Sequence, residues 1–175
     1  MYDGTTTGNN NIAIGAEVGN RITSGYNNVL MGKSAGNVLT TGNTNVYLGY
    51  EAGYYGATNS KNIAIGYHAF YNPDDGLDGC VAIGYNAMGA GDITDPHYTI
   101  AIGFNALLNL TSGDKNIAIG AYAGEELLGG DNNIALGYEA LDALSAGDDN
   151  IAIGYQSMKT ANNVGVDRNV AVGNY

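Results

Sequence analysis

A short phrase that ends in glycine, such as Asn62-Ile63-Ala64-Ile65-Gly66, recurs ten times along the 175 residues of the chain. Its glycine stands at positions 15, 32, 49, 66, 84, 103, 120, 137, 154 and 173, so that most repeats are 17 residues long. Such a unit is too short for the helical hairpin of a helical solenoid, whose units have ~33 residues or more. We therefore predict one repeat domain over residues 1–175, an all-β parallel β-solenoid in which ten coils stack ~4.8 Å apart.

Several columns of like residues support this prediction. Three residues before each glycine the chain has Ile or Val, and one residue before it has Ile, Leu, Met or Val. These two columns share one face of a strand, and we predict that this face forms the core. A column of small residues follows each turn, and a looser apolar column holds Ile22, Leu39, Leu110, Leu127 and Leu144. Asparagine before most strands predicts a ladder of stacked side-chain amides.

Alanine dominates the strand position between the two β-branched columns. Alternation then points this alanine column away from the core of its own coil. It is either a lightly constrained exposed face or a surface that allows close approach of another subunit. Each coil buries only a few small side chains, so contact with identical neighbours would add to its apolar burial. On that interpretation the interface of a homotrimer comprises Ala64, Ala82, Ala101, Ala118, Ala135 and Ala152.

The phrase Asn-Ile-Ala-Ile-Gly-Tyr-x-Ala, seen at residues 62–69, resembles the YadA-like head repeats of trimeric autotransporter adhesins. Together with corners such as Thr40-Thr41-Gly42, it resembles repeat arrays of bacteriophage tail fibres even more closely. The resemblance implies a left-handed β-roll, a homotrimer, and a place outside the cell on a virion tail fibre or a bacterial surface. It also implies a role as a shaft or in attachment to a host receptor. Because the chain begins in a corner and stops after a strand, we expect either that it is an excerpt of a longer fibre or that its ends stack on further protein, such as adjoining fibre segments.

Composition excludes several other classes of protein. There are 6 Lys and Arg against 17 Asp and Glu, giving a net charge of −11 that disfavours binding to nucleic acid. No apolar run approaches the ~20 residues needed to cross a membrane, so we expect no membrane insertion. The hydrophobic fraction of 45% is too high for a disordered acidic tail.

Residues with catalytic potential are few and scattered, so we predict a protein that is not an enzyme. His68 and His97 lie on different coils without a patterned acid or nucleophile, and Cys80 takes the place of an asparagine before its strand. The alternative is an acyltransferase-like left-handed β-helix, because residues 65–70 match one hexapeptide of that class. The rest of each repeat does not match it. No organic cofactor is indicated.

Two inserted loops carry both prolines and a group of acids on adjacent coils, at residues 71–79 and 90–97. Insertions on one face of a solenoid are often its binding surface. The acids form either a solvated loop or a Ca²⁺ site, whose ligands would be oxygen atoms. The candidate ligands are Asp74, Asp75, Asp78, Asp92 and Asp95.

An aromatic column follows the repeated glycine and begins at Tyr50. Such rings either pack between coils or subunits, or form a strip that contacts a glycan or protein receptor on the host surface. The candidate contact residues are Tyr67, Tyr85, Phe104, Tyr138 and Tyr155.

Overall fold

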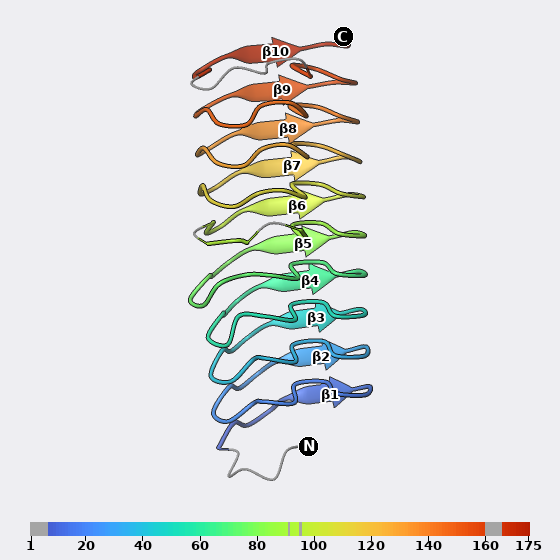
Figure 1. Cartoon of the computed structure of the whole chain (residues 1–175), viewed down its shortest axis with the longest axis vertical. Helices are drawn as coiled ribbons and strands as arrows, with labels where there is room; N and C mark the ends of the chain where they lie inside the picture. Colours follow the sequence, from blue (N-terminus) through green and yellow to red (C-terminus); the bar gives the residue numbers. More distant parts are fainter. Residues whose placement is uncertain (1–6, 91, 95, 160–165) are drawn as a thin grey trace.

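The computed structural model describes residues 7–90, 92–94, 96–159 and 166–175, and these form a β-solenoid. Ten strands lie in one parallel sheet in the order of the sequence, one strand to each coil (Figure 1). The prediction of an all-β parallel β-solenoid is confirmed. The strands are β1 (Ile12–Ile14), β2 (Val29–Met31), β3 (Val46–Leu48), β4 (Ile63–Ile65), β5 (Val81–Ile83), β6 (Ile100–Ile102), β7 (Ile117–Ile119), β8 (Ile134–Leu136), β9 (Ile151–Ile153) and β10 (Val170–Val172).

The register between coils follows the repeat. Ile63 of β4 pairs with Val81 of β5, and Val81 pairs with Ile100 of β6, although residues are inserted in both intervening loops. The insertions therefore project from the coil and leave the sheet undisturbed. From β1 to β10 the stack rises by about 43 Å at the usual strand spacing. Among the described residues, no helix is long and apolar enough to cross a membrane.

The recurrent glycine allows the coils to approach closely at the end of each strand. Gly66 has φ +134°, and a Cβ atom there would lie 2.3 Å from the carbonyl oxygen of Gly84 in the next coil. Likewise, a Cβ atom on Gly84 would lie 2.2 Å from the carbonyl oxygen of Gly103. Any side chain in this column would push two backbones apart, so the spacing of the stack requires glycine here.

The face of the sheet that forms the core is opposite to the predicted one. The alanine column points inward, and the proposed interface residues Ala64, Ala82, Ala101, Ala118, Ala135 and Ala152 are at most 2% exposed within a single chain. The β-branched columns point outward, with Ile12, Ile14 and Ile119 among the exposed side chains. The prediction that these alanines contact another subunit is thus wrong. Alternation separates two faces but does not say which one is inside, and the narrow interior of the coil accepts the smaller residues.

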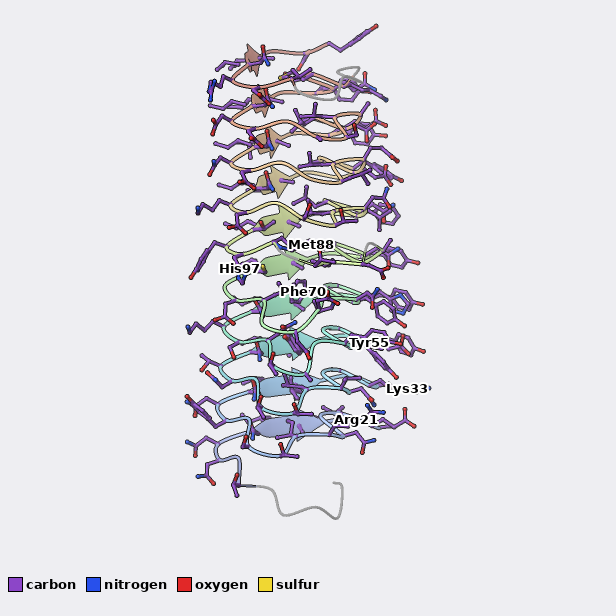
Figure 2. All side chains as sticks on the ribbon, turned by 60° about the vertical axis from the view of Figure 1, so that its left-hand side comes forward. Arg21, Lys33, Tyr55, Phe70, Met88 and His97 are labelled. Carbon is purple, nitrogen blue, oxygen red and sulfur yellow. The ribbon has the colours of Figure 1, made fainter. Side chains whose placement is uncertain are left out.

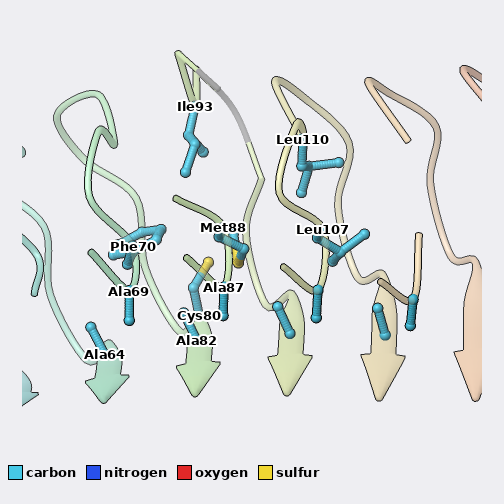
Figure 3. Packing of buried hydrophobic residues seen from close by; sticks show 14 of the residues in the cluster. Ala64, Ala69, Phe70, Cys80, Ala82, Ala87, Met88, Ile93, Leu107 and Leu110 are labelled. Carbon is cyan, nitrogen blue, oxygen red and sulfur yellow. The ribbon is translucent and has the colours of Figure 1, made fainter. Parts of the chain in front are cut away.

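The rest of the core agrees with the predicted columns. Alanines after the turn, such as Ala69 and Ala87, are fully buried and face the strand alanines (Figure 3). Leu39, Leu110 and Leu144 of the looser column are also fully buried. Residues from these three columns belong to one continuous hydrophobic cluster along the rod.

Large and small residues exchange places between two core columns. Coils with a large residue in the middle of the strand, Leu30 or Tyr47, have glycine six residues later, at Gly36 and Gly53. Most coils with alanine there have a large residue instead; the buried pairs are Ala64 with Phe70, Ala82 with Met88, Ala101 with Leu107 and Ala135 with Leu141 (Figure 3). The exceptions are Ala13 with Gly19 and Ala118 with Gly124, where Leu30 and Leu107 of a neighbouring coil occupy the space beside the glycine. A Cβ atom on Gly53 would lie 2.5 Å from the Tyr47 ring, so the two positions share one space.

The predicted asparagine ladder is present and buried. Asn133 Nδ2 donates to Asn116 Oδ1 at 3.1 Å and to the Gly147 carbonyl at 2.7 Å. Its own Oδ1 accepts the backbone N–H and the Nδ2 of Asn150. Each asparagine of this kind thereby ties three coils together and satisfies backbone groups that would otherwise be buried without partners.

Candidate functional site

An apolar strip runs along the outer face of the sheet. It consists of the two outward apolar columns, the Ile and Val residues three before each repeated glycine and the Ile, Leu, Met and Val residues one before it, which flank the inward column of mainly alanine. Met31 and Ile119 are 40% and 42% exposed, and the members in most other coils are half-buried. A solvated outer face of a sheet normally carries polar side chains. An apolar strip of this length is characteristic of a surface that binds another protein surface.

The predicted aromatic column forms a ladder of stacked rings on another side of the rod. The Tyr50 and Tyr67 centroids are 5.2 Å apart and the ring planes differ by 8°. The stack continues through Tyr85 to Phe104, with neighbouring centroids 5.0 Å and 5.2 Å apart. Tyr138 and Tyr155 stack in the same manner at 5.4 Å. All five predicted contact residues, Tyr67, Tyr85, Phe104, Tyr138 and Tyr155, therefore belong to one ladder and are 41–52% exposed.

The geometry of the ladder limits what it can bind. Because the rings stack face to face along the rod, their faces cover one another and their edges are left for solvent. A sugar that packs on an aromatic residue uses the face of the ring, so regular stacking favours packing between coils as the principal role of this column. At the edge, interaction with the carboxylates of Glu51 and Glu139 raises the pKa of the Tyr50 and Tyr138 hydroxyls.

Sequence reasoning missed some of the aromatic residues. The column has Ala121 where a ring is expected, and Tyr122 fills the gap with edge contacts to Phe104 and Tyr138. A side cluster of Tyr54, Tyr55 and Tyr71 adjoins His68, whose ring lies 4.4 Å from that of Tyr71. Tyr122 could have been predicted from the sequence, because it directly follows Ala121, the residue that interrupts the aromatic column.

The two inserted loops lie side by side, as predicted. Pro73 and Ile93 form a parallel bridge, and the Asp74 backbone N–H donates to the Ile93 carbonyl at 2.7 Å. The Ile93 backbone N–H donates in turn to the Asn72 carbonyl at 3.2 Å. Ile93 is fully buried and packs in the core (Figure 3). The loops are therefore anchored parts of the stack.

The acids of these loops have separate partners. Asp75 accepts the Ala57 backbone N–H, Asp78 accepts the Ser60 backbone N–H at 3.1 Å, and Asp92 accepts from Asn72 Nδ2. Asp74 is exposed, and Asp95 lies outside the described residues. Within the described part of the chain, no group of three or more His, Cys, Asp or Glu is arranged to hold a metal ion. The geometry therefore gives no support to the Ca²⁺ site.

The histidines and the cysteine have structural contacts. His68 Nε2 is 2.9 Å from Glu51 Oε2, and His97 Nδ1 accepts the Asp78 backbone N–H at 3.2 Å. Cys80 Sγ is 3.0 Å from the Pro96 carbonyl oxygen, in the place where neighbouring asparagines donate to a corner carbonyl. Burial raises the pKa of the Cys80 thiol to about 11, so the thiolate that a nucleophile requires is disfavoured.

A second group of acids lies toward the C-terminal coils. Burial, followed by repulsion from Glu125 and Glu139, raises the pKa of Asp142 to about 6. One carboxylate oxygen of Asp142 is buried without a hydrogen-bond partner among the described residues. Contact with Lys159 lowers the pKa of the neighbouring Glu139.

Comparison of the chain with protein-family models, curated proteins and solved structures finds no match.

Proposed function

We propose that the chain is a non-enzymatic structural and attachment module of an extracellular fibre, assembled as a homotrimer through the outer face of its sheet. The observation that carries the proposal is the apolar strip of mainly Ile and Val side chains along the rod, exposed at Ile12, Met31 and Ile119. Burying this strip between identical chains would add a second apolar layer to a core built largely of alanine.

The uniform register supports a mechanical role. Nine successive strand pairings in one sheet give a straight rod of constant cross-section (Figure 1). Such a rod can hold a binding tip at a distance from a particle or a cell, or contact the host surface along its side. The trimeric state, and a place in a phage tail fibre or a bacterial adhesin, follow from the resemblance of the repeats to those families.

The assembly can be tested by light scattering coupled to size-exclusion chromatography. We expect the mass of a trimer for the unmodified chain and a smaller species for Ile119→Glu, whose carboxylate would be placed in the interface. Leu128→Glu is a matched control, because Leu128 is 44% exposed but lies at a corner away from the sheet. A monomer for the unmodified chain at micromolar concentration would contradict the proposal, as would equal masses for Ile119→Glu and the unmodified chain.

A further inference from the structure

A hollow of about 530 Å³ opens on the corner where the two inserted loops lie. Segments of four successive coils contribute to its wall, which comprises Val38, Tyr55, Gly56, Ala57, Asn72, Pro73, Asp74, Asp75 and Thr94. Ligand sites in proteins commonly have volumes of about 300–1,000 Å³. We propose that this hollow binds a neutral hexopyranose unit of a host-surface glycan, an inference that rests on the attachment role proposed above.

The hollow has an origin in the repeat. The apolar column that includes Leu39 and Leu110 occupies the seventh position after each repeated glycine. In three consecutive coils the sequence has Gly56, Pro73 and Gly91 at this position, so the column of large apolar residues is interrupted there. A sequence built only for stacking would continue the column. The interruption coincides with the insertions, whose Leu77 and Ile93 are buried in the core, and the hollow opens at the surface beside Gly56 and Pro73.

A buried amide lies behind Gly56, one of the residues that line this space. Asn59 is fully buried; its Oδ1 accepts the Leu77 backbone N–H at 2.8 Å, but its Nδ2 has no hydrogen-bond partner among the described residues. A Cβ atom on Gly56 would lie 2.1 Å from Asn59 Nδ2 and 3.2 Å from Pro73 Cγ. The Asn59 amide nitrogen thus lies directly behind Gly56, which lines the hollow, and the wall at this point is polar beneath its surface.

The remaining lining combines an aromatic ring with hydrogen-bonding groups. Tyr55 projects from the rod (Figure 2), is 40% exposed, and makes edge contacts with Tyr54 and Tyr71 that restrain its apolar ring. Asp74 and Thr94 are exposed on the same hollow. A pyranose has one apolar face of C–H groups and a rim of hydroxyls, and this pairing of ring and acceptors matches it.

Charge selects among possible ligands. The lining residues include Asp74 and Asp75 and no Lys, Arg or His. In a chain of net charge −11 this hollow repels anionic sugars such as sialic acids. The backbone hydrogen bonds between the inserted loops hold the hollow open before the ligand arrives, which reduces the ordering cost of binding.

Saturation-transfer NMR and calorimetry on the full chain would test the inference. The probes are the methyl glycosides of glucose, galactose, mannose and N-acetylglucosamine, with sialyllactose and trilysine as charged comparisons. We expect at least one neutral glycoside to bind saturably, and Tyr55→Ala and Asp74→Ala each to weaken that binding about tenfold. Tyr155→Ala is the matched control, because Tyr155 is an exposed ring of the ladder distant from the hollow.

Three outcomes would overturn the inference. These are no saturable signal from any neutral glycoside, binding of trilysine alone, and loss of binding in Tyr155→Ala with none in Tyr55→Ala. Tyr55→Ala could disturb the tyrosine cluster as well as the hollow. Asp74→Ala removes only an exposed side chain, so its effect on sugar binding can be interpreted even in that case. The light-scattering result is independent of sugar binding, so failure here is distinguishable from failure of the proposed trimer.

Discussion

At the scale of single residues, polar side chains inside the rod work as connectors between coils. Cys80 illustrates how specific this role is, because its thiol reaches the Pro96 carbonyl just as asparagines in other coils reach theirs. A thiol is a weak donor and cannot also accept two N–H groups in the way that an amide oxygen does. The ladder is consequently interrupted next to the inserted loops.

Asn133→Ala tests how much one asparagine of the ladder contributes to the free energy of unfolding. It removes the bond to Gly147 O and leaves the Asn150 backbone N–H buried without its acceptor. Because unpaired buried groups keep their full desolvation cost, we expect a loss of about 2–4 kcal/mol in the free energy of unfolding. Urea denaturation measures it. Asn109→Ala is the control, since the side chain of Asn109 makes one hydrogen bond, of 3.5 Å, at the surface. An equal loss of stability in both variants would contradict the stabilising role of the asparagine ladder.

Asp142 predicts a pH-dependent contribution to stability. Its pKa rises from 3.8 to about 6 on folding, so between these values the folded chain binds more protons than the unfolded chain. Stability from this group is therefore present below pH 4 and is lost as the pH rises through 6.

We accordingly expect Asp142→Asn to match the unmodified chain below pH 4 and to be more stable above pH 6. Because Asp142 is partly solvated, screening reduces the gain to about 1 kcal/mol. Thermal melting at a series of pH values measures the difference. Asp74→Asn, on an exposed loop, is the control, and a constant difference between Asp142→Asn and the unmodified chain across the series would refute the assignment.

At the scale of the coil, the repeat predicted where each strand begins and ends but not which side of it is inside. The β-branched columns of β4 to β6 and the alanines between them satisfy alternation equally well in either orientation. The missing information is volume: the exchange of Tyr47 with Gly53, and of Ala64 with Phe70, shows that the middle strand position packs against the residue six places later. The exchange is visible in the sequence of most coils, although Ala13 and Ala118 are followed by Gly19 and Gly124, and it favours the correct orientation.

The binding hollow was harder to predict. The insertions and the acids at Asp74 and Asp75 were recognisable as a surface feature. The part played by Tyr55 and Gly56 depends on segments of different coils meeting at one corner. Their residue types are ordinary in the repeat, and only the three-dimensional stack brings them to the inserted loops.

Gly53→Leu tests the exchange between core columns. Leu107 and Leu141 occupy the equivalent position with φ of +48° and +56°, so the backbone can accept leucine. In this coil, however, the new side chain would collide with Tyr47, and we expect a loss of about 2–4 kcal/mol from overpacking and backbone strain. Combined with Tyr47→Ala, the same change should recover most of that loss. A double-mutant cycle by denaturation measures the coupling, and simple additivity would contradict the shared space.

At the scale of the whole molecule, each coil contacts mainly its two neighbours, so stability should be approximately the sum of coil and interface terms. Deletion of residues 121–137 removes one complete unit and joins Gly120 to Tyr138 in register. Strand β7 would then pair with β9, and Tyr138 would follow Phe104 in the aromatic ladder without the gap at Ala121.

We expect this deletion variant to fold with the same circular dichroism spectrum and a rod shorter by about 4.8 Å in small-angle scattering. Deletion of residues 121–129 is the contrasting variant. It removes half of one coil, so the chain can no longer close the turn between β7 and β8, and we expect the stack to be divided there and to lose its single cooperative unfolding transition. If both deletions are tolerated equally, registry between coils does not determine the structure; if neither is tolerated, the coils are not independent units, and the rod behaves as one indivisible domain.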